Sequence, residues 1–204
     1  KELDRLKNLK ISTNSKKKNK GKIFIGIKGK SLDGNDFVDE ALKNGSKLAI
    51  IQNKKGNSKK KIKVKNTLNL LTELSKKVRV SSKACNIAIT GSSGKTSLKE
   101  LLGQSLKINY PTVFSKNSYN NKFGLPFSLL NLKKNTLYGV FEIGMDKKGE
   151  IDYLSKIIKP DIGIITNISY AHAINFNSLF DIAKAKSEII NNIKSNGTII
   201  LNRD

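Results

Sequence analysis

The stretch Ile87-Ala-Ile-Thr-Gly-Ser-Ser-Gly-Lys-Thr-Ser97 decides the fold of the second half of this 204-residue chain. Its apolar start, Ile87 to Ile89, predicts a short β-strand, and the glycines that follow predict a tight turn. Leucines at helical spacing then predict a helix over Thr96 to Leu106. An apolar strand that runs into a glycine-rich turn at the start of a helix is typical of a phosphate-binding loop.

The residue types of this turn suit phosphate chemistry. Glycine lets backbone N–H groups approach phosphate oxygens, and the start of the helix adds a partial positive charge. Lys95 can reach terminal phosphates, and the Thr96 hydroxyl can ligate Mg²⁺. The turn departs from the general P-loop pattern at Ile89, where a glycine is usual, and the alternative is an ordinary turn with an incidental lysine. The flanking elements favour phosphate binding, for which the expected residues are Gly91, Ser92, Ser93, Gly94, Lys95, Thr96 and Ser97.

The pattern of strand, turn and helix repeats after this loop. Apolar runs predict strands over Tyr138 to Ile143, Ile162 to Asn167 and Thr198 to Leu201, with helices around 150–156 and 178–193. This alternation predicts a parallel sheet covered on both faces. Ligands of such sheets bind outside the carboxyl ends of the strands.

Two candidate metal-site residues follow strands of this predicted sheet. Glu142 ends one strand, and a carboxylate there could hold Mg²⁺ directly or through water. His172, the only histidine, follows another strand and could complete a metal shell or bond a phosphate oxygen. A structural histidine and a solvated strand end are the alternatives, and the shared placement favours a site.

Two further segments carry candidate residues. The loop Asn117 to Pro126 is rich in amides, and Asn120 and Asn121 offer paired donors and acceptors near the expected nucleotide, although a plain turn would also explain it. Lys184 and Lys186 follow a helical pattern, and their spacing alone describes two lysines on a helix surface.

The first 82 residues predict a smaller α/β unit. Lys22 to Lys28 places three isoleucines on one face of a strand, short apolar runs follow at 49–51 and 62–64, and residues 37–43 suit a small helix. A helix over Thr67 to Arg79 leads to an expected domain boundary near Ser82.

Charge and cysteine content limit the function classes. The net charge of +23 suggests a polyanionic partner, but only three of the 39 basic residues are arginine, which nucleic-acid readers favour. A Lys-rich solvated surface is therefore the preferred interpretation, although the excess in residues 1–85 suits an anionic ligand. No apolar run approaches the roughly 18 residues of a membrane span. The single Cys85 cannot form an intrachain disulfide, and we expect a cytoplasmic protein. Because the chain opens at Lys1 and stops after an apolar run, we expect a piece of a longer protein.

Taken together, these residues resemble the ATP-dependent Mur ligase family of peptidoglycan synthesis. The resemblance runs from about Ser12 to the end of the chain, and the asparagine-pair loop with Gly124 and Pro126 favours the member that adds D-alanyl-D-alanine. The motifs that carry it are TGSSGKTS (90–97), NSYNNKFGLPFSLLNL (117–132), EIGMDKKGEI (142–151), KPDIGIITNISYAH (159–172) and FNSLFDIAKAKSEI (176–189).

The resemblance implies a fold and a reaction. The fold would be a substrate domain over residues 1–82 and an incomplete P-loop-type ATPase domain with a parallel sheet over 83–204. The reaction would use ATP and Mg²⁺ to join D-alanyl-D-alanine to UDP-N-acetylmuramoyl-tripeptide through an acyl phosphate, in a monomer with no nucleic-acid or membrane partner. This piece alone would be inactive. The alternatives are a sister ligase that adds a single amino acid, a basic P-loop ATPase stimulated by nucleic acid, and a non-catalytic binding module.

The resemblance also assigns roles to residues. Lys95, His172 and Lys186 would be catalytic, with Lys186 matching a lysine that is carbamylated in several Mur ligases. The metal ligands would be Thr96, Glu142, His172 and carbamylated Lys186. The uridine-nucleotide region is matched more loosely, since Asn14, Lys16 and Asn35 stand where Asp, Arg and His are usual. Its expected substrate-binding residues are Ser15, Lys16, Asp33 and Gly34.

Overall fold

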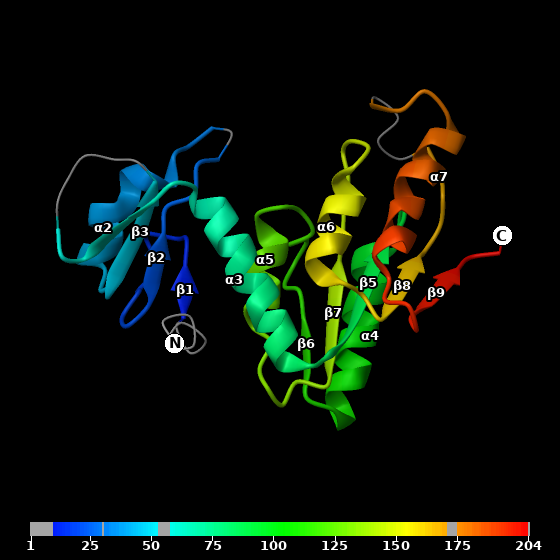
Figure 1. Cartoon of the computed structure of the whole chain (residues 1–204), viewed down its shortest axis with the longest axis horizontal. Helices are drawn as coiled ribbons and strands as arrows, with labels where there is room; N and C mark the ends of the chain where they lie inside the picture. The colour runs from blue at the N-terminus through cyan, green and yellow to red at the C-terminus, as the bar shows by residue number, and fades with distance from the viewer. Residues whose placement is uncertain (1–9, 30, 53–57, 171–174, 204) are drawn as a thin grey trace. The chain divides into compact units, whose positions relative to one another are not determined.

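The computed structural model describes residues 10–29, 31–52, 58–170 and 175–203, in two compact units, 1–74 and 75–204 (Figure 1). The division falls within helix α3 (Thr67–Ser82), whereas the sequence suggested a boundary near Ser82, at the end of this helix.

The first unit is a small parallel sheet with a helix packed on it. Helix α2 (Val38–Lys43) follows a 3₁₀ helix, η1 (Gly34–Phe37), and packs through Val38 and Ala41 against Phe24 of the sheet. The four strands are parallel and paired in chain order: β1 (Ile11–Ser12), β2 (Ile23–Ile25), β3 (Leu48–Gln52) and β4 (Lys61–Val64).

The expected strand over Lys22 to Lys28 is shorter in the structure, because β2 ends at Ile25 and Ile27 lies beyond it. Ile23 and Ile25 share one face as expected, and Phe24 on the other face is buried as well, so both faces of this strand are covered. The strand is central in a parallel sheet, and such strands have no face left for water.

The second unit is a five-stranded parallel sheet with helices on both faces. The strand order is β6-β7-β5-β8-β9. The strands are β5 (Cys85–Thr90), β6 (Thr112–Phe114), β7 (Tyr138–Glu142), β8 (Ile162–Ile165) and β9 (Thr198–Leu201). The helices are α4 (Lys95–Asn109), α5 (Gly124–Leu129), α6 (Glu150–Ile158), α7 (Leu179–Ser187) and the 3₁₀ helix η3 (Glu188–Asn192).

Alternation along the strands distributes the core between the two faces. Ile87 and Ile89 of β5 and Val140 of β7 belong to one cluster, against which Leu98, Leu102 and Leu106 of α4 pack, whereas Leu101 of that helix is exposed. Ala88 and Phe141 point the other way, into a cluster built from α5, α6, α7 and η3. The sequences of the central strands are therefore continuous apolar runs, as expected for a parallel sheet that is covered on both faces.

Strand order places the glycine loop at the switch point of this sheet. From β5 the chain passes through α4 to β6 and β7 on one side, and from β7 it passes through α6 to β8 on the other side of β5. In the register, Ile89 pairs with Glu142, and Thr90 pairs with Ile165. The loop after β5 and the end of β7 therefore lie at the same carboxyl edge, where ligands of such sheets bind.

The predicted α/β class with parallel sheets is confirmed, and one helix and one strand of the larger unit differ from expectation in a way that bears on the site. The helix expected over 178–193 is α7 followed by the separate 3₁₀ helix η3. The strand expected over 162–167 ends at Ile165, because the following residues turn toward the glycine loop. Among the described residues, no helix combines the length and apolar character needed to cross a membrane.

Candidate phosphate and metal site

Two glycines shape the turn between β5 and α4. Gly91 has a φ of +147°, and a Cβ placed on it would lie 1.9 Å from Oγ1 of Thr166. Gly94, with a φ of +76°, takes the left-handed conformation directly before the first helical residue, Lys95. Only glycine fits the first position without a clash, and glycine avoids the steric cost of the second.

The segment after β8 holds this turn from the side. The backbone N–H of Ser92 donates to the carbonyl of Asn167 (3.0 Å), and that of Ser93 donates to Asn167 Oδ1 (2.9 Å). In return, the Asn167 amide donates to Ser93 Oγ (2.7 Å), and the Thr166 hydroxyl donates to Ser93 O (2.6 Å). No role was expected for Thr166 or Asn167 from the sequence, where both lie at the carboxyl end of the predicted strand 162–167, and this place at a strand end was the one signal for them.

Lys95 lies over the turn that precedes it. Its ammonium donates to the carbonyls of Gly91 (2.7 Å) and Ser92 (3.1 Å). Burial lowers the pKa of Lys95, and the negative charge of Glu142 acts in the opposite direction. The amine is therefore held at the loop, within electrostatic reach of a carboxylate.

Glu142 is the buried centre of the site, with 2% of its surface exposed at the end of β7. The Thr96 hydroxyl donates to its Oε2 atom (2.8 Å), and the Asn120 amide donates to its Oε1 atom (2.8 Å). Three segments far apart in sequence thus converge on one carboxylate: the first turn of α4, the asparagine loop and the end of β7.

This donor set suits a hard cation such as Mg²⁺. The carboxylate of Glu142 and the hydroxyl of Thr96 are oxygen ligands, and Mg²⁺ is usually held by one or two carboxylates plus waters and substrate phosphates. Within the described residues no three His, Cys, Asp or Glu side chains form a metal cluster. Glu142 and Thr96 therefore fit a magnesium ion shared with phosphate oxygens, and they do not form a cage that encloses the metal alone.

Lys186 is a second buried lysine, within electrostatic range of Lys95. Its side chain is only 1% exposed, whereas Lys184 lies on the exposed side of the same helix. Burial, followed by the positive charge of Lys95, lowers the pKa of Lys186 from 10.5 to about 8. The interpretation of Lys186 as a surface lysine is wrong, because a residue two positions from Lys184 lies on the other side of a helix.

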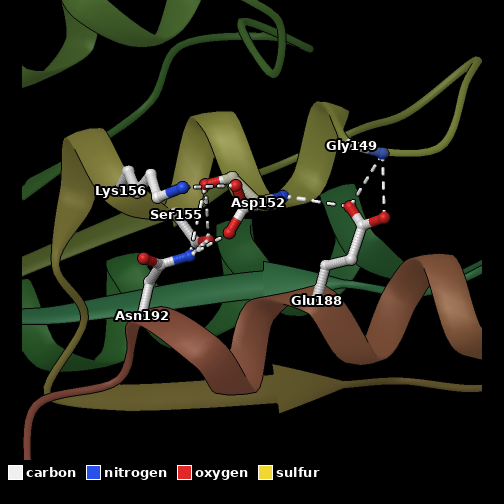
Figure 2. Close-up of polar contacts among 6 residues, drawn as sticks. All are labelled: Gly149, Asp152, Ser155, Lys156, Glu188 and Asn192. Carbon is white, nitrogen blue, oxygen red and sulfur yellow. Dashed lines mark hydrogen bonds and ion pairs between the residues drawn. The ribbon is translucent and has the colours of Figure 1, made fainter.

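The segment that follows Lys186 is tied to helix α6 (Figure 2). The Glu188 carboxylate accepts hydrogen bonds from the backbone N–H groups of Gly149 (2.8 and 3.0 Å) and Asp152 (3.1 Å) at the start of α6. The Asn192 amide donates to the Asp152 carboxylate (2.9 Å) and to Ser155 Oγ (2.9 Å). A carboxylate at a helix N-terminus is stabilised by the helix dipole, so these contacts fix the end of α7 that carries Lys186.

The other residues expected at this site lie in different surroundings. Asn121 Oδ1 accepts from the backbone N–H groups of Phe123 and Gly124 (both 3.0 Å), at the start of α5. Ser97 is exposed on the first turn of α4. His172 lies outside the described residues. Of the expected residues, hydrogen bonds bring Thr96, Asn120 and Glu142 together, while Lys95 interacts electrostatically with Glu142, and Lys186 with Lys95.

The residues expected to bind the uridine nucleotide lie in the first unit. The buried Ser15 hydroxyl donates to Glu40 Oε2 (2.5 Å), and Lys16 is exposed. Asp33 caps η1 by accepting from the backbone N–H of Asn35 (2.9 Å). A Cβ on Gly34 would lie 2.7 Å from backbone atoms of Ile27, so this turn requires glycine.

A strand, a glycine loop and a helix, with a buried carboxylate at the end of the neighbouring strand, define a P-loop-type α/β domain. Comparison with known families is consistent with this class and narrows it: residues 89–204 match the model described as Mur ligase middle domain. The chain belongs to the Mur ligase family.

Individual relatives cover both units of the chain. UDP-N-acetylmuramoyl-tripeptide--D-alanyl-D-alanine ligase of Buchnera aphidicola is 41% identical over 194 residues, which are 95% of this chain and 43% of that protein. A crystal structure of MurF from Acinetobacter baumannii superposes with a TM-score of 0.88 at 36% identity, over 96% of this chain and 43% of its own. The structure of MurF ligase from Thermotoga maritima in complex with ADP gives a TM-score of 0.88 at 33% identity, over 100% and 47%. The chain thus spans less than half the length of these relatives.

Proposed function

We propose that this chain provides the uridine-nucleotide domain and part of the ATPase domain of a ligase that joins D-alanyl-D-alanine to UDP-N-acetylmuramoyl-tripeptide. The observation that carries the proposal is the convergence of Thr96 and Asn120 on the buried Glu142, within the electrostatic reach of Lys95. Relatives at 33 to 41% identity bear the names of this ligase, and one of them was solved with ADP.

The proposed reaction has two steps. The terminal carboxylate of the tripeptide attacks the γ-phosphorus of ATP, and ADP leaves with the electrons of the broken P–O bond. The free amine of D-alanyl-D-alanine then attacks the acyl carbon, a proton is lost from the amine, and inorganic phosphate leaves. The main barrier is the repulsion between two anions, so the site has to neutralise and align them.

The residues of the glycine loop are suited to that task. Lys95 would exchange the carbonyls of Gly91 and Ser92 for phosphate oxygens, to which it would bring its positive charge. Thr96 and Glu142 would hold Mg²⁺ through the hydroxyl and carboxylate oxygens that now bond each other. When bound, the magnesium ion would neutralise phosphate charge and orient the phosphate group.

Lys186 is the proposed site of carbamylation. A lysine with a pKa of about 8 is partly neutral near neutral pH, and only the neutral amine attacks CO₂. Formation of the N–C bond releases a proton and leaves a carbamate, whose oxygens would provide a second anionic metal-binding group. His172 is proposed as a metal-associated residue on the basis of the family resemblance alone.

The first unit is proposed to bind the uridine nucleotide through Ser15, Lys16, Asp33 and Gly34. Its excess of lysine is consistent with a ligand that carries two phosphates. We further propose that the protein acts in the cytoplasm as a monomer, without nucleic-acid or membrane partners.

The choice of nucleophile tests the proposal. The protein encoded by the complete reading frame is incubated with ATP, Mg²⁺ and UDP-N-acetylmuramoyl-tripeptide, and ADP release is compared with D-alanyl-D-alanine and with single amino acids. Release that requires D-alanyl-D-alanine supports the proposal. A parallel assay replaces the tripeptide by the shorter muramoyl precursor. ADP release there with a single amino acid would instead assign the chain to a sister ligase.

A further inference from the structure

A buried lysine without a role in the proposed chemistry lies one helical turn after Lys95 and Thr96. Lys99 is 0% exposed, and its ammonium donates to the carbonyls of Ser115 (2.8 Å) and Asn117 (2.8 Å). It also pairs with Glu100 Oε1 at 2.7 Å. A lysine ammonium has three N–H donors, so these three acceptors use all of them. Lys99 is therefore saturated by protein groups and has no donor left for a phosphate.

The two carbonyls that Lys99 binds lie at the start of the asparagine loop. Asn117 takes a left-handed conformation, with a φ of +49°, and three residues later Asn120 donates to Glu142. The other end of this short segment is fixed by the Gly144 N–H, which donates to the Asn120 carbonyl (2.8 Å). Lys99 and Gly144 thus hold the two ends of the turn that carries the Asn120 side chain.

A second contact links Ser115, one of the two residues bound by Lys99, to Glu142 itself. The hydroxyl of Ser115 accepts from the backbone N–H of Glu142 (3.4 Å), while the carbonyl of Ser115 accepts from Lys99. Thr96, which donates to the Glu142 carboxylate, precedes Lys99 by three residues and so lies on the same face of α4. One helix face therefore provides both a direct partner of Glu142 and the cation that orders its other partner.

We infer that Lys99 is a positioning residue, which holds the asparagine loop so that Asn120 stays bonded to Glu142 and orients this carboxylate for its ligand. Without the ammonium, the carbonyls of Ser115 and Asn117 lose their common donor, and one of these two carbonyls belongs to the residue in the left-handed conformation. The inference rests on the proposed function only in its last step, the effect on magnesium and nucleotide use. Its structural steps are testable without either ligand.

The structural steps are tested by Lys99→Met, which keeps the side-chain length and removes the donors. Glu100→Gln is the matched control, since it removes the charge paired with Lys99 and leaves both carbonyl bonds in place. Amide hydrogen exchange over residues 115–121, and the side-chain amide signal of Asn120 in ¹⁵N NMR spectra, are recorded without nucleotide. Lys99→Met is expected to accelerate exchange in this segment and to shift the Asn120 signal, and Glu100→Gln to do neither. Unchanged exchange and an unshifted signal in Lys99→Met would overturn the inference.

A second pair of variants covers the case in which Lys99→Met does not fold. Asn117 is exposed, and Asn117→Ala disfavours its left-handed turn, whereas Asn117→Gly leaves this conformation accessible. Faster exchange and a shifted Asn120 signal in Asn117→Ala but not in Asn117→Gly support the inference. Equal behaviour of the two variants contradicts it.

The functional step is tested in the protein encoded by the complete reading frame. Outer contacts of metal ligands typically contribute about 10- to 100-fold to metal affinity or activity, so Lys99→Met should raise the Mg²⁺ concentration required for half-maximal ADP release by about tenfold. Asn120→Ala should have a similar effect, and the double variant should be no worse than either single one. Additive losses would mean that Lys99 does not act through Asn120. If only the proposed function is wrong, the wild-type protein shows no ADP release with these substrates, while Lys99→Met still accelerates exchange and shifts the Asn120 signal.

Discussion

The Thr96 hydroxyl and the Glu142 carboxylate, 46 residues apart in sequence, are joined by a 2.8 Å hydrogen bond at the carboxyl edge of the larger sheet. The strand register brings these two side chains together, because Glu142 lies opposite Ile89, close to the point where β5 enters the glycine loop. Helix α4 begins at the end of this loop, and its second residue therefore faces the end of β7. A hydroxyl and a carboxylate in this position are oxygen ligands of the kind that hold a phosphate-bound Mg²⁺ ion, as proposed for this site.

Replacing Glu142 by Gln tests the metal role of this carboxylate. The amide keeps the shape and can still accept a hydrogen bond from Thr96, but it has one acceptor oxygen fewer for Asn120, and it lacks the negative charge that attracts Mg²⁺. We expect the Mg²⁺ concentration for half-maximal ADP release to rise about 10- to 100-fold, with a folding cost of about 1 to 3 kcal/mol from the lost buried hydrogen bond. A magnesium titration of wild type and variant, with circular dichroism to compare folding, measures this. An unchanged titration curve would remove Glu142 from the metal site.

The two glycines of the loop are expected to differ in their tolerance of alanine. Gly91→Ala forces a Cβ to within 1.9 Å of Thr166 Oγ1, and we expect a loss of about 3 kcal/mol in the free energy of unfolding. Gly94→Ala meets no atom within 4 Å and incurs only the left-handed backbone cost of about 1 kcal/mol. Urea unfolding of both variants gives the difference directly. Equal losses would show that backbone conformation, and not the contact with Thr166, decides the requirement for Gly91.

The pKa of Lys186 predicts a stability change with pH. Folding lowers this pKa from 10.5 to about 8, so between these values the unfolded chain binds more protons than the folded one. Stability from this group therefore rises as pH increases from about 8 toward 10.5, and it is constant at its lower level below the folded pKa, where both states are protonated. The difference in unfolding free energy between wild type and Lys186→Met, measured from pH 7 to 10.5, should increase in favour of wild type over this window. A difference independent of pH would show that Lys186 titrates normally.

The Glu188 contact shown in Figure 2 should contribute more to stability than the neighbouring ion pair. Glu188→Ala removes the acceptor of two N–H groups at the start of α6, for which we expect a loss of about 1 to 2 kcal/mol. Lys156→Ala breaks an exposed pair with Asp152 on the same helix and should cost about 0.3 to 0.5 kcal/mol. Urea unfolding of the two variants ranks the contacts. A Lys156→Ala loss as large as that of Glu188→Ala would contradict this ranking.

The sequence predicted the parts of this fold that repeat a simple pattern. Apolar runs marked the strands of the larger sheet, and glycines before a lysine and a threonine marked the loop, because both signals are local. The burial of Lys186 was not predictable from its spacing, since Lys184 and Lys186 are equivalent until the helix is docked on its neighbours.

Long-range contacts account for the rest of what was missed. The hydrogen bonds of Asn167 to the glycine loop cross 74 residues, and no local pattern distinguishes this asparagine from many others in the chain. Asn120 and Asn121 were indistinguishable for the same reason, although one bonds Glu142 and the other caps α5. Lys99 looked like one more lysine among 39 basic residues, until the docking of α4 buried it.

The central claim is that the loop containing Lys95 is the phosphate site of a ligase, and one comparison tests it most directly. ADP release is measured with UDP-N-acetylmuramoyl-tripeptide and D-alanyl-D-alanine for wild type, Lys95→Ala and the exposed-lysine control Lys184→Ala, all in the protein of the complete reading frame. Loss of one preorganised donor to transition-state charge typically lowers the rate about 10²- to 10³-fold, which we predict for Lys95→Ala and not for Lys184→Ala. Release by Lys95→Ala at the wild-type rate would contradict the account.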